Sequence, residues 1–557
     1  MLRRVCLLVF GAFLTACQPE QSAPQSQSAG PSVSERLTVY SGGTIYTGRG
    51  LETVEAVAVD ASGTIVMVSP PGSQDWDETE ITHVDLQGAF MFPGFVDGHV
   101  HLLGVGQREL TLNLEGTASI AELVTRIERE LQGLSSGQVL YGRGWIETGW
   151  PEARMPIAAD LDAVSPDNPV ILTRADGHAL VANTAALNAA GITDDTSDVE
   201  GGQIERTSEG KATGVLIDNA MAAVLRLVSA PEEADIVAAY VVGAKEYSAR
   251  GWTGVHNMSV NPQQAALMER LDLEGRLPLR IHNAFDQEGF ELAAARQYET
   301  DTITNRAVKL YMDGALGSRG ALLIQPYSDR PDSQGLSLMA PEILAEQMQR
   351  AATEDVQLAI HAIGDLANRH ILNTFEAGGY AADLRWRIEH TQVLHPDDIS
   401  RIGVLGLIAS MQPSHAIGDL KFAPARLGIE RLVGAYAWQS LLGTNARIVG
   451  GSDAPVEVGS PLIEFYAAVA RKDLSGVSGE GWHPEQALSR SQALALFTSA
   501  PAYAAFMEDR LGTIEVGKTA DFSVFDRDLM TIPEAEILQT KPVFTVVAGT
   551  QLKAGAS

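Results

Sequence analysis

The sequence predicts an α/β protein: a (β/α)8 TIM barrel with a small β domain assembled from both termini and an insertion after strand 1. Three observations support this fold class in the 557 residues. Apolar strand-like runs alternate with amphipathic helix patterns through the middle of the chain. Both ends of the chain carry short β-rich runs. A long segment interrupts the alternation after the first barrel strand, and alternating strands and helices favour a parallel barrel.

The first β-rich region covers residues 36–92. It contains short runs of β-branched and aromatic residues that are separated by glycines, and Asp60-Ala61-Ser62-Gly63 fits a hairpin turn. The same pattern returns at 522–525 and 543–547. We therefore expect 36–92 and 507–557 to form one composite β-sandwich domain.

The middle of the chain, residues 93–506, provides eight strand candidates for the barrel. They are Ala89–Val96, Gly254–Asn257, Pro278–Asn283, Ala307–Met312, Gln357–Ile360, Arg385–Glu389, Gly406–Met411 and Ala446–Val449. Helix patterns lie between them, at Pro231–Arg250, Pro341–Thr353, Glu430–Leu442 and Ser491–Phe506. The segment between the first two strands is too long for one connection, so we expect an insertion at about 110–230 that caps the barrel mouth.

The N-terminus has the layout of an export signal. Basic residues precede a short apolar run and small residues, which predicts a signal peptide over 1–16. Leu14-Thr15-Ala16-Cys17 resembles the lipobox of bacterial lipoproteins, so we expect lipid on Cys17 and a flexible tether over 17–35. The alternative is a plain signal peptide with an incidental cysteine. The lipobox interpretation predicts an exported, lipid-anchored protein, on the periplasmic side of the outer membrane.

The composition excludes several classes of function. Acidic residues number 70 against 40 basic ones, a formal charge of −30, which argues against binding to nucleic acid or docking on anionic lipid. Membrane contact is expected only through the lipid anchor, and a small molecule is the expected substrate. The oligomeric state stays open, with a homodimer as one option. The only cysteines are Cys6 and Cys17, so the folded body must hold any metal through His, Asp, Glu or modified Lys.

The strongest local motif is Gly94-Phe95-Val96-Asp97-Gly98-His99-Val100-His101. His99 and His101 are two residues apart at the end of the first barrel strand, and a period of two points both side chains the same way. In a barrel this direction is the interior at the C-terminal mouth, where active sites form. Two convergent imidazoles can share a divalent cation.

Lys309 lies inside the predicted strand Ala307–Met312. Barrel strands are buried on both faces, and burial lowers the pKa of a lysine. A neutral amine can add CO2 and become a carbamate, which is an anionic metal ligand. The alternative is a lysine paired with a buried carboxylate such as Asp313.

Three further strand ends carry single candidates. His361 and His390 close the fifth and sixth strands, and Asp453 follows the eighth. Each alone fits a buried polar group with a structural partner. Together with His99, His101 and Lys309, they place metal-binding side chains at the ends of strands one, four, five, six and eight, which packing alone does not explain.

This set resembles the amidohydrolase superfamily. The runs 309–319 (Lys-Leu-Tyr-Met-Asp-Gly-Ala-Leu-Gly-Ser-Arg), 361–365 (His-Ala-Ile-Gly-Asp) and 387–392 (Arg-Ile-Glu-His-Thr-Gln) are similar to the amidohydrolase family 3 branch, which includes N-substituted formamide deformylases. The resemblance covers about residues 36–553 and implies a distorted barrel with a composite sandwich.

The resemblance also implies a ligand set and a reaction. His99 and His101 would bind one metal with Asp453, His361 and His390 would bind a second, and carboxylated Lys309 would bridge them. One or two divalent ions, with Zn²⁺ as the expected metal, would activate a water that attacks the amide-type C–N bond of a small molecule. Asp453 would accept the proton of that water and pass it to the leaving amine.

Other polar side chains are candidates for supporting roles. Asp97 is expected to orient His99 or His101. Substrate contacts are expected from four residues: His178 in the insertion, His415 after strand seven, His256 at the end of strand two and Trp145 in the insertion. Each of these four also fits a purely structural role.

Three functions compete for this ligand set. The first is hydrolysis of a C–N bond other than a standard peptide bond. The second is deamination, or hydrolysis of a lactone or ester, in the same superfamily. It stays open because water activated at one metal site can attack several kinds of electrophile. The third is a non-catalytic ligand-binding lipoprotein, which predicts loss of ligands, whereas all six positions are intact.

Overall fold

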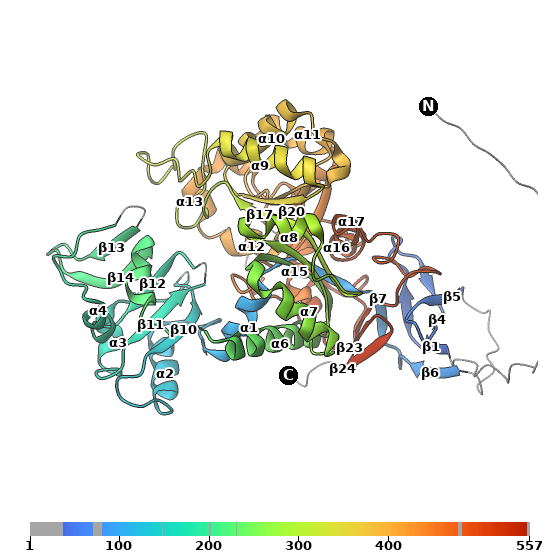
Figure 1. The fold of residues 1–557 in the computed structure, drawn as a ribbon, viewed down its shortest axis with the longest axis horizontal. Helices are drawn as coiled ribbons and strands as arrows, with labels where there is room; N and C mark the ends of the chain where they lie inside the picture. Colours follow the sequence, from blue (N-terminus) through green and yellow to red (C-terminus); the bar gives the residue numbers. More distant parts are fainter. Residues whose placement is uncertain are drawn as a thin grey trace, which may run out of the picture.

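The structure is a computed structural model, and it describes residues 37–70, 81–147, 149–175, 177–199, 202–229, 231–476 and 482–553. The predicted signal peptide, Cys17 and the tether lie outside these residues. Three bodies follow one another in Figure 1: the insertion on the left, the barrel in the centre and the β-sandwich on the right. Within the described residues, no helix has both the length and the apolar character that a membrane crossing requires.

An eight-stranded parallel sheet forms the nearly closed barrel in the centre, which confirms the predicted fold class. Neighbouring strands pair in sequence order. The strands are β8 (Phe95–Val100), β15 (Trp252–Val260), β16 (Arg280–Phe285), β17 (Ile303–Tyr311), β18 (Gln357–Ala362), β19 (Arg387–His390), β20 (Ile408–Met411) and β21 (Arg447–Gly450).

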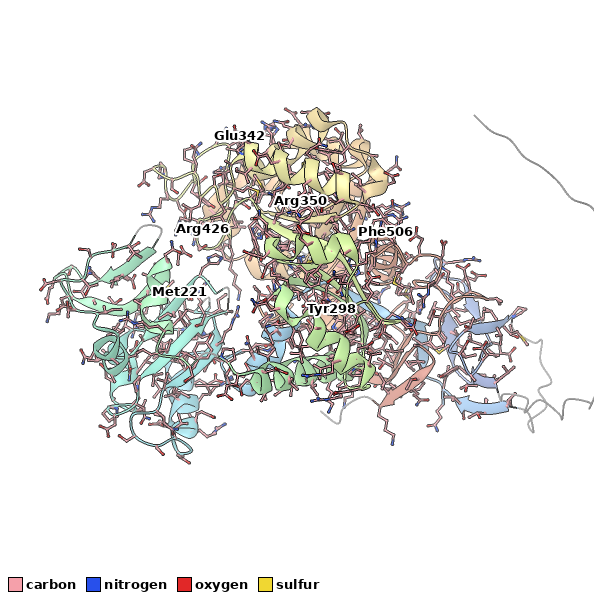
Figure 2. All side chains as sticks on the ribbon, in the orientation of Figure 1. Met221, Tyr298, Glu342, Arg350, Arg426 and Phe506 are labelled. Atoms are coloured by element: carbon pink, nitrogen blue, oxygen red, sulfur yellow. The ribbon has the colours of Figure 1, made fainter. Side chains whose placement is uncertain are left out.

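Helices surround the barrel and connect its strands. They are α1 (Leu102–Leu110), α6 (Glu233–Arg250), α7 (Ala265–Leu273), α8 (Phe290–Ala295), α9 (Pro341–Glu354), α10 (Asp365–Gly378), α11 (Pro396–Leu405), α12 (Pro413–Asp419), α14 (Trp438–Leu442), α15 (Pro461–Ala470), α16 (Arg490–Phe497) and α17 (Ser499–Ala504). Local sequence sets their ends: α11 begins at Pro396 and stops at Gly406, which adopts a left-handed conformation. After α17, the ring of Phe506 (Figure 2) lies 3.6 Å from the guanidinium of Arg306.

The barrel closes where β21 approaches β8. Gly98 permits this approach, because a Cβ there would lie 2.3 Å from Cγ1 of Val449 and 2.6 Å from the carbonyl oxygen of Gly450. Just beyond the strand ends, the amide of Asp453 donates to the carbonyl of His99 at 2.7 Å, and the amide of His101 donates to the carbonyl of Ala454 at 2.8 Å. The residues after strands one and eight are therefore tied together by main-chain hydrogen bonds.

The first predicted strand, Ala89–Val96, is in fact two strands. Phe90–Pro93 forms β7 in the β-sandwich, and the barrel strand β8 begins at Phe95. Apolar character runs through both segments because β7 and β8 are each buried, so hydrophobicity alone did not mark the boundary. β8 therefore extends past the predicted end and includes His99.

The β-sandwich draws on both ends of the chain, as predicted. One sheet has the order β5-β4-β1-β6, and the other has the order β24-β23-β22-β7-β2-β3. Their bounds are β1 (Leu37–Ser41), β2 (Thr44–Tyr46), β3 (Thr53–Val54), β4 (Ala56–Val59), β5 (Ile65–Ser69), β6 (Ile81–Asp85), β22 (Phe522–Phe525), β23 (Pro542–Val547) and β24 (Thr550–Lys553). β22 pairs antiparallel with β7, so a C-terminal strand completes a sheet that the N-terminal region begins.

The insertion has its own six-stranded sheet, in the order β13-β14-β12-β11-β10-β9. The elements are β9 (Leu112–Asn113), α2 (Ile120–Leu131), β10 (Leu140–Trp145), α3 (Ala158–Asp162), β11 (Val170–Arg174), β12 (Ala179–Ala182), α4 (Thr184–Ala190), β13 (Gly202–Arg206), β14 (Ala212–Asp218) and α5 (Ala222–Leu225). Alternating residues of β11 bury on opposite faces: Ile171 joins one apolar cluster and Leu172 joins another. Two cores make the insertion a structured unit rather than a loop.

Candidate active site

A cavity of about 640 Å³ opens at the C-terminal ends of the barrel strands. The barrel contributes the ends of β8, β17, β18 and β19 and the segments after β20 and β21. The insertion contributes the opposite wall, which includes Gly144, Ile146 and Arg174. The insertion therefore borders the barrel mouth, where barrel enzymes place their active sites.

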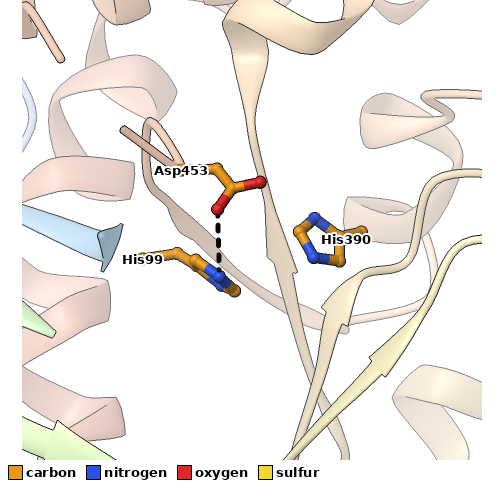
Figure 3. A group of neighbouring side chains, drawn as sticks. All are labelled: His99, His390 and Asp453. Atoms are coloured by element: carbon orange, nitrogen blue, oxygen red, sulfur yellow. Dashed lines mark ion pairs between the residues drawn. The ribbon is translucent and has the colours of Figure 1, made fainter. Parts of the chain in front are cut away.

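Two side chains that line this cavity, His390 and Asp453, converge with the fully buried His99 (Figure 3). His99 on β8, His390 at the end of β19 and Asp453 after β21 each offer a ligand atom, and these atoms lie within 4.8 Å of one another. Nε2 of His99 lies 3.4 Å from Oδ1 of Asp453. All three residues are buried.

The other three predicted ligands surround this group. Nε2 of His101 lies 3.2 Å from Oδ1 of Asp453, and Nζ of Lys309 lies 3.3 Å from Nε2 of His99. The ring centroids of His361 and His390 lie 4.5 Å apart. The structure thus brings all six predicted ligand positions together at one end of the barrel.

The orientation of three imidazoles fits a metal site. Nδ1 of His99 contacts a carboxylate oxygen of Glu389 at 2.6 Å, Nδ1 of His101 contacts the carbonyl of Met258 at 3.2 Å, and Nδ1 of His390 contacts Oε1 of Gln412 at 2.8 Å. All three partners are acceptors, so each Nδ1 carries the proton and each Nε2 presents a lone pair. Neutral imidazoles held in this way, beside a carboxylate, are the donor set of a divalent cation.

Burial keeps the central imidazole neutral. Desolvation and the nearby Lys309 lower the pKa of His99 to about 4. Desolvation likewise brings the pKa of His390 well below its usual range. Neither ring therefore needs to lose a proton before it can coordinate a cation at neutral pH.

Lys309 does not pair with Asp313, which was the alternative to a carbamate. Asp313 instead accepts hydrogen bonds from the main-chain amides of Leu322, Ile363 and Gly364 at 2.8–3.0 Å. Burial lowers the pKa of Lys309 to about 8, so an appreciable fraction of the amine is neutral in mildly basic solution. A neutral, buried amine beside the cluster is the form that reacts with CO2.

Backbone conformation at the site is unusual for the residue types present. His390 has a φ of 73° and Asp453 a φ of 61°, both in the left-handed region that favours glycine. The hydrogen bond from the amide of Asp453 to the carbonyl of His99 stabilises one of these conformations. Strained non-glycine residues of this kind are typical of functional sites.

A buried charged network below His99 was missed by the sequence analysis. Arg387 donates two hydrogen bonds to the carboxylate of Glu389, at 2.7 and 3.1 Å, and a third to the carbonyl of Gly98 at 2.7 Å. Arg387 and Glu389 are buried and two residues apart on β19, so both point into the barrel. The argument that a charge inside a barrel strand is costly, which singled out Lys309, applies equally to this pair.

Three predicted supporting roles need correction. Trp145 lies in the core of the insertion, where its indole donates to the carbonyl of Leu172, and it does not line the cavity. His256 is inside β15 below the site, 2.5 Å from Nη1 of Arg387, because that strand continues to Val260. Asp97 accepts hydrogen bonds from the main-chain amides of His99 and Ser452 and not from an imidazole. It therefore positions the main chain at these two residues.

His178 and His415 both line the cavity. Nδ1 of His178 lies 2.8 Å from Oδ1 of Asp218 in the insertion. His415 is on α12, with Nε2 3.7 Å from Oδ2 of Asp453. Their contact with substrate stays a prediction.

The Glu389 carboxylate provides a test of the metal site that does not depend on turnover. Replacing Glu389 with glutamine should weaken metal binding by about 10–100-fold, because the negative charge that supports the Nδ1 proton of His99 is lost. Competition with a coloured chelator measures the affinity. Glu508→Gln is the matched control, since Glu508 pairs with Arg385 outside the cavity. Equal affinities in the two variants would contradict this role of Glu389.

Comparisons with known proteins agree with the geometry. The sequence model of the amidohydrolase family matches residues 82–552. "Putative amidohydrolase YtcJ" of Bacillus subtilis is 32% identical over 92% of this chain and 98% of its own length. An N-substituted formamide deformylase of Arthrobacter pascens is 28% identical, over 84% of this chain and 89% of its own. A crystal structure of a metal-dependent hydrolase from Pyrococcus horikoshii superposes with a TM-score of 0.71 at 27% identity, covering 89% of this chain and 99% of that one.

Proposed function

This chain belongs to the amidohydrolase family and is a metal-dependent hydrolase, and from that premise we propose that it cleaves an amide-type C–N bond in a small molecule. The observation that carries the proposal is the cluster of His99, His390 and Asp453 at the base of a cavity large enough for a small organic molecule. Similarity to a formamide deformylase over most of both chains supports the choice of bond.

Six residues would hold one or two divalent ions, with Zn²⁺ suited to this mixture of imidazole and carboxylate. They are His99, His101, Lys309 as its carbamate, His361, His390 and Asp453. When bound, such an ion supplies Lewis-acid polarisation and lowers the pKa of water. The Nε2 atoms of His99 and His101 both face Oδ1 of Asp453, which supports a shared ligand position.

The protein residues account for the proton transfers. Asp453 is the only carboxylate in the three-residue cluster, so it is the group placed to accept a proton from attacking water and deliver it to the leaving nitrogen. His415 lies beside Oδ2 of Asp453 and is placed to hydrogen-bond the substrate during this transfer. The insertion forms the wall of the cavity that faces these groups.

Metal removal tests metal dependence directly. Chelation should abolish hydrolysis, and Zn²⁺, Mn²⁺ or Co²⁺ added to the metal-free protein should restore it, because the ligand set has no other source of Lewis acidity. The measurement is steady-state rate against metal content, with the near-ultraviolet circular dichroism spectrum as a check on folding. Full activity in protein shown to be free of metal would contradict the proposal.

Product analysis separates the C–N hydrolase from its alternatives. Metal-loaded protein should release a carboxylate and an amine from at least one of N-acyl amino acids, N-substituted formamides, dipeptides and cyclic amides. Release of ammonia, or hydrolysis of lactones alone, would identify the deaminase or lactone hydrolase instead. The same screen on Asp453→Asn protein reports any contaminating hydrolase.

A further inference from the structure

Most charged side chains on the cavity wall have a partner of opposite charge or a full set of hydrogen bonds. Glu115 pairs with Arg108 at 2.8 Å, and Arg174 pairs with Glu147 at 2.8 Å. The carboxylate of Asp419 accepts hydrogen bonds from a glutamine amide and a tyrosine hydroxyl. These groups are satisfied within the protein, so they have little remaining capacity for a charged ligand.

Glu457 is different. It lies after β21 on the cavity wall, and its side chain retains 27% exposure. Among the described residues, no donor lies within hydrogen-bonding distance of its carboxylate. Nε2 of His415 lies 3.9 Å from its Oε1. A partly enclosed carboxylate without a protein donor must take its hydrogen bonds from water or from a ligand.

His415 provides a second, independent sign of a missing partner. The residue is 9% exposed, it lines the cavity, and its Nε2 has no hydrogen-bond partner in the described part of the chain. This nitrogen lies 3.7 Å from Oδ2 of Asp453 and 3.9 Å from Oε1 of Glu457. The two unpartnered groups therefore adjoin each other, directly beside the metal-binding cluster.

The electrostatic surroundings favour a cation at this point. Burial, and the carboxylates of Glu464, Asp419, Asp453 and Glu115, shift the pKa of Glu457 well above its usual range. A positive group of the ligand would offset this mutual repulsion and keep Glu457 ionised. Glu464 is fully buried, and burial raises the pKa of its carboxyl to about 8, so its charge contributes to this effect only in basic solution.

We propose that Glu457 and His415 form a subsite for a protonated amine carried by the substrate close to its scissile bond. An ammonium group has three donors, enough to serve both the carboxylate of Glu457 and the unpartnered Nε2 of His415. The contact of His415 with Asp453 places this nitrogen near the reacting bond rather than at the far end of the molecule. This inference rests on the proposed function and narrows its substrates to amides that contain a basic amine.

The apolar part of such a substrate also has a place in the cavity. Ile146 from the insertion and Tyr311 at the end of β17 are large apolar side chains that line it and remain 40% and 37% exposed. A ligand with one hydrocarbon or aromatic portion and one ammonium group would cover these surfaces and pair with Glu457. A suitable probe therefore combines an aromatic ring with an ammonium group.

Binding of three probes of matched size tests the subsite without turnover. The probes are 3-phenylpropylammonium, neutral 3-phenylpropan-1-ol and anionic 3-phenylpropanoate, titrated calorimetrically into full-length, metal-loaded protein at neutral pH. The ammonium should bind about tenfold or more tightly than the alcohol, which is the scale of one charge-assisted hydrogen bond. Glu457→Gln should abolish this preference, whereas Glu457→Asp should retain part of it.

Lys421→Gln is the matched control, because Lys421 is a charged residue on the same wall. This variant should keep or increase the preference for ammonium. An equal preference in wild-type and Glu457→Gln protein, or a preference for the carboxylate, would overturn the inference. The outcome is distinguishable from failure of the proposed function: amide hydrolysis without an ammonium preference removes only the subsite, and the preference without hydrolysis removes only the reaction.

Discussion

Replacing Asp453 with asparagine should lower kcat by about 10²–10⁴-fold, the range expected when a general acid–base is removed. Asparagine has nearly the same shape, so the main-chain hydrogen bond between Asp453 and His99 should persist and the chain should fold. The amide cannot accept the proton that the carboxylate takes from water. Steady-state kinetics on metal-loaded protein measures the effect.

The control for this variant is Asp397→Asn, on α11, where the carboxylate is solvent-exposed and remote from the cavity. It should show wild-type kcat. Metal content measured in parallel separates loss of the base from loss of a ligand. Near-normal turnover in Asp453→Asn protein would remove Asp453 as the base, whatever its metal content.

Replacing Lys309 with alanine should weaken metal binding by more than about 100-fold, because residues that only orient a ligand already contribute 10–100-fold. Nζ of Lys309 lies 3.3 Å from Nε2 of His99, and the proposed carbamate would supply the negative charge that two cations need between them. Acetate or formate should partly restore metal content and activity, since a small carboxylate can occupy the space of the carbamate.

Lys309→Arg is the matched variant, because arginine keeps the positive charge but does not form a carbamate at neutral pH. It should lose metal as alanine does, and short carboxylates should not rescue it, because the longer side chain fills the space. Full metal content in Lys309→Ala protein would contradict the bridging role. So would an electron-density map of metal-loaded, bicarbonate-treated protein in which the amine is unmodified.

The sequence carried enough information for the barrel and for the clustering of the six candidate ligand positions. Period-two spacing predicted that the imidazoles of His99 and His101 point to the same side of the strand. In the structure, Nε2 of each lies within 3.4 Å of Oδ1 of Asp453. Single residues at strand ends, such as His390, could be placed because parallel strands bring their C-terminal ends to one rim. These inferences used only local pattern and the geometry of a closed parallel sheet.

The incorrect predictions concern residues whose role depends on where they lie within a strand. His256 was expected at a strand end, but β15 extends to Val260, and the strand's apolar run does not show where it stops. Trp145 is at the end of β10, and only the folded insertion shows that it faces a core. Glu389 was not among the candidates, although a carboxylate within a buried strand requires a partner, which here is Arg387.

The pairing of β7 with β22 has a consequence for biogenesis. Only Gly94 separates β7 from β8, which carries His99, so the first barrel strand is joined to a sheet that needs residues from the far end of the chain. During synthesis, β7 is made long before β22, the strand with which it pairs. We therefore expect the first barrel strand to be fully anchored only once β22 has been made, and deletion of the segment from β22 onward to lower activity although that segment does not line the cavity.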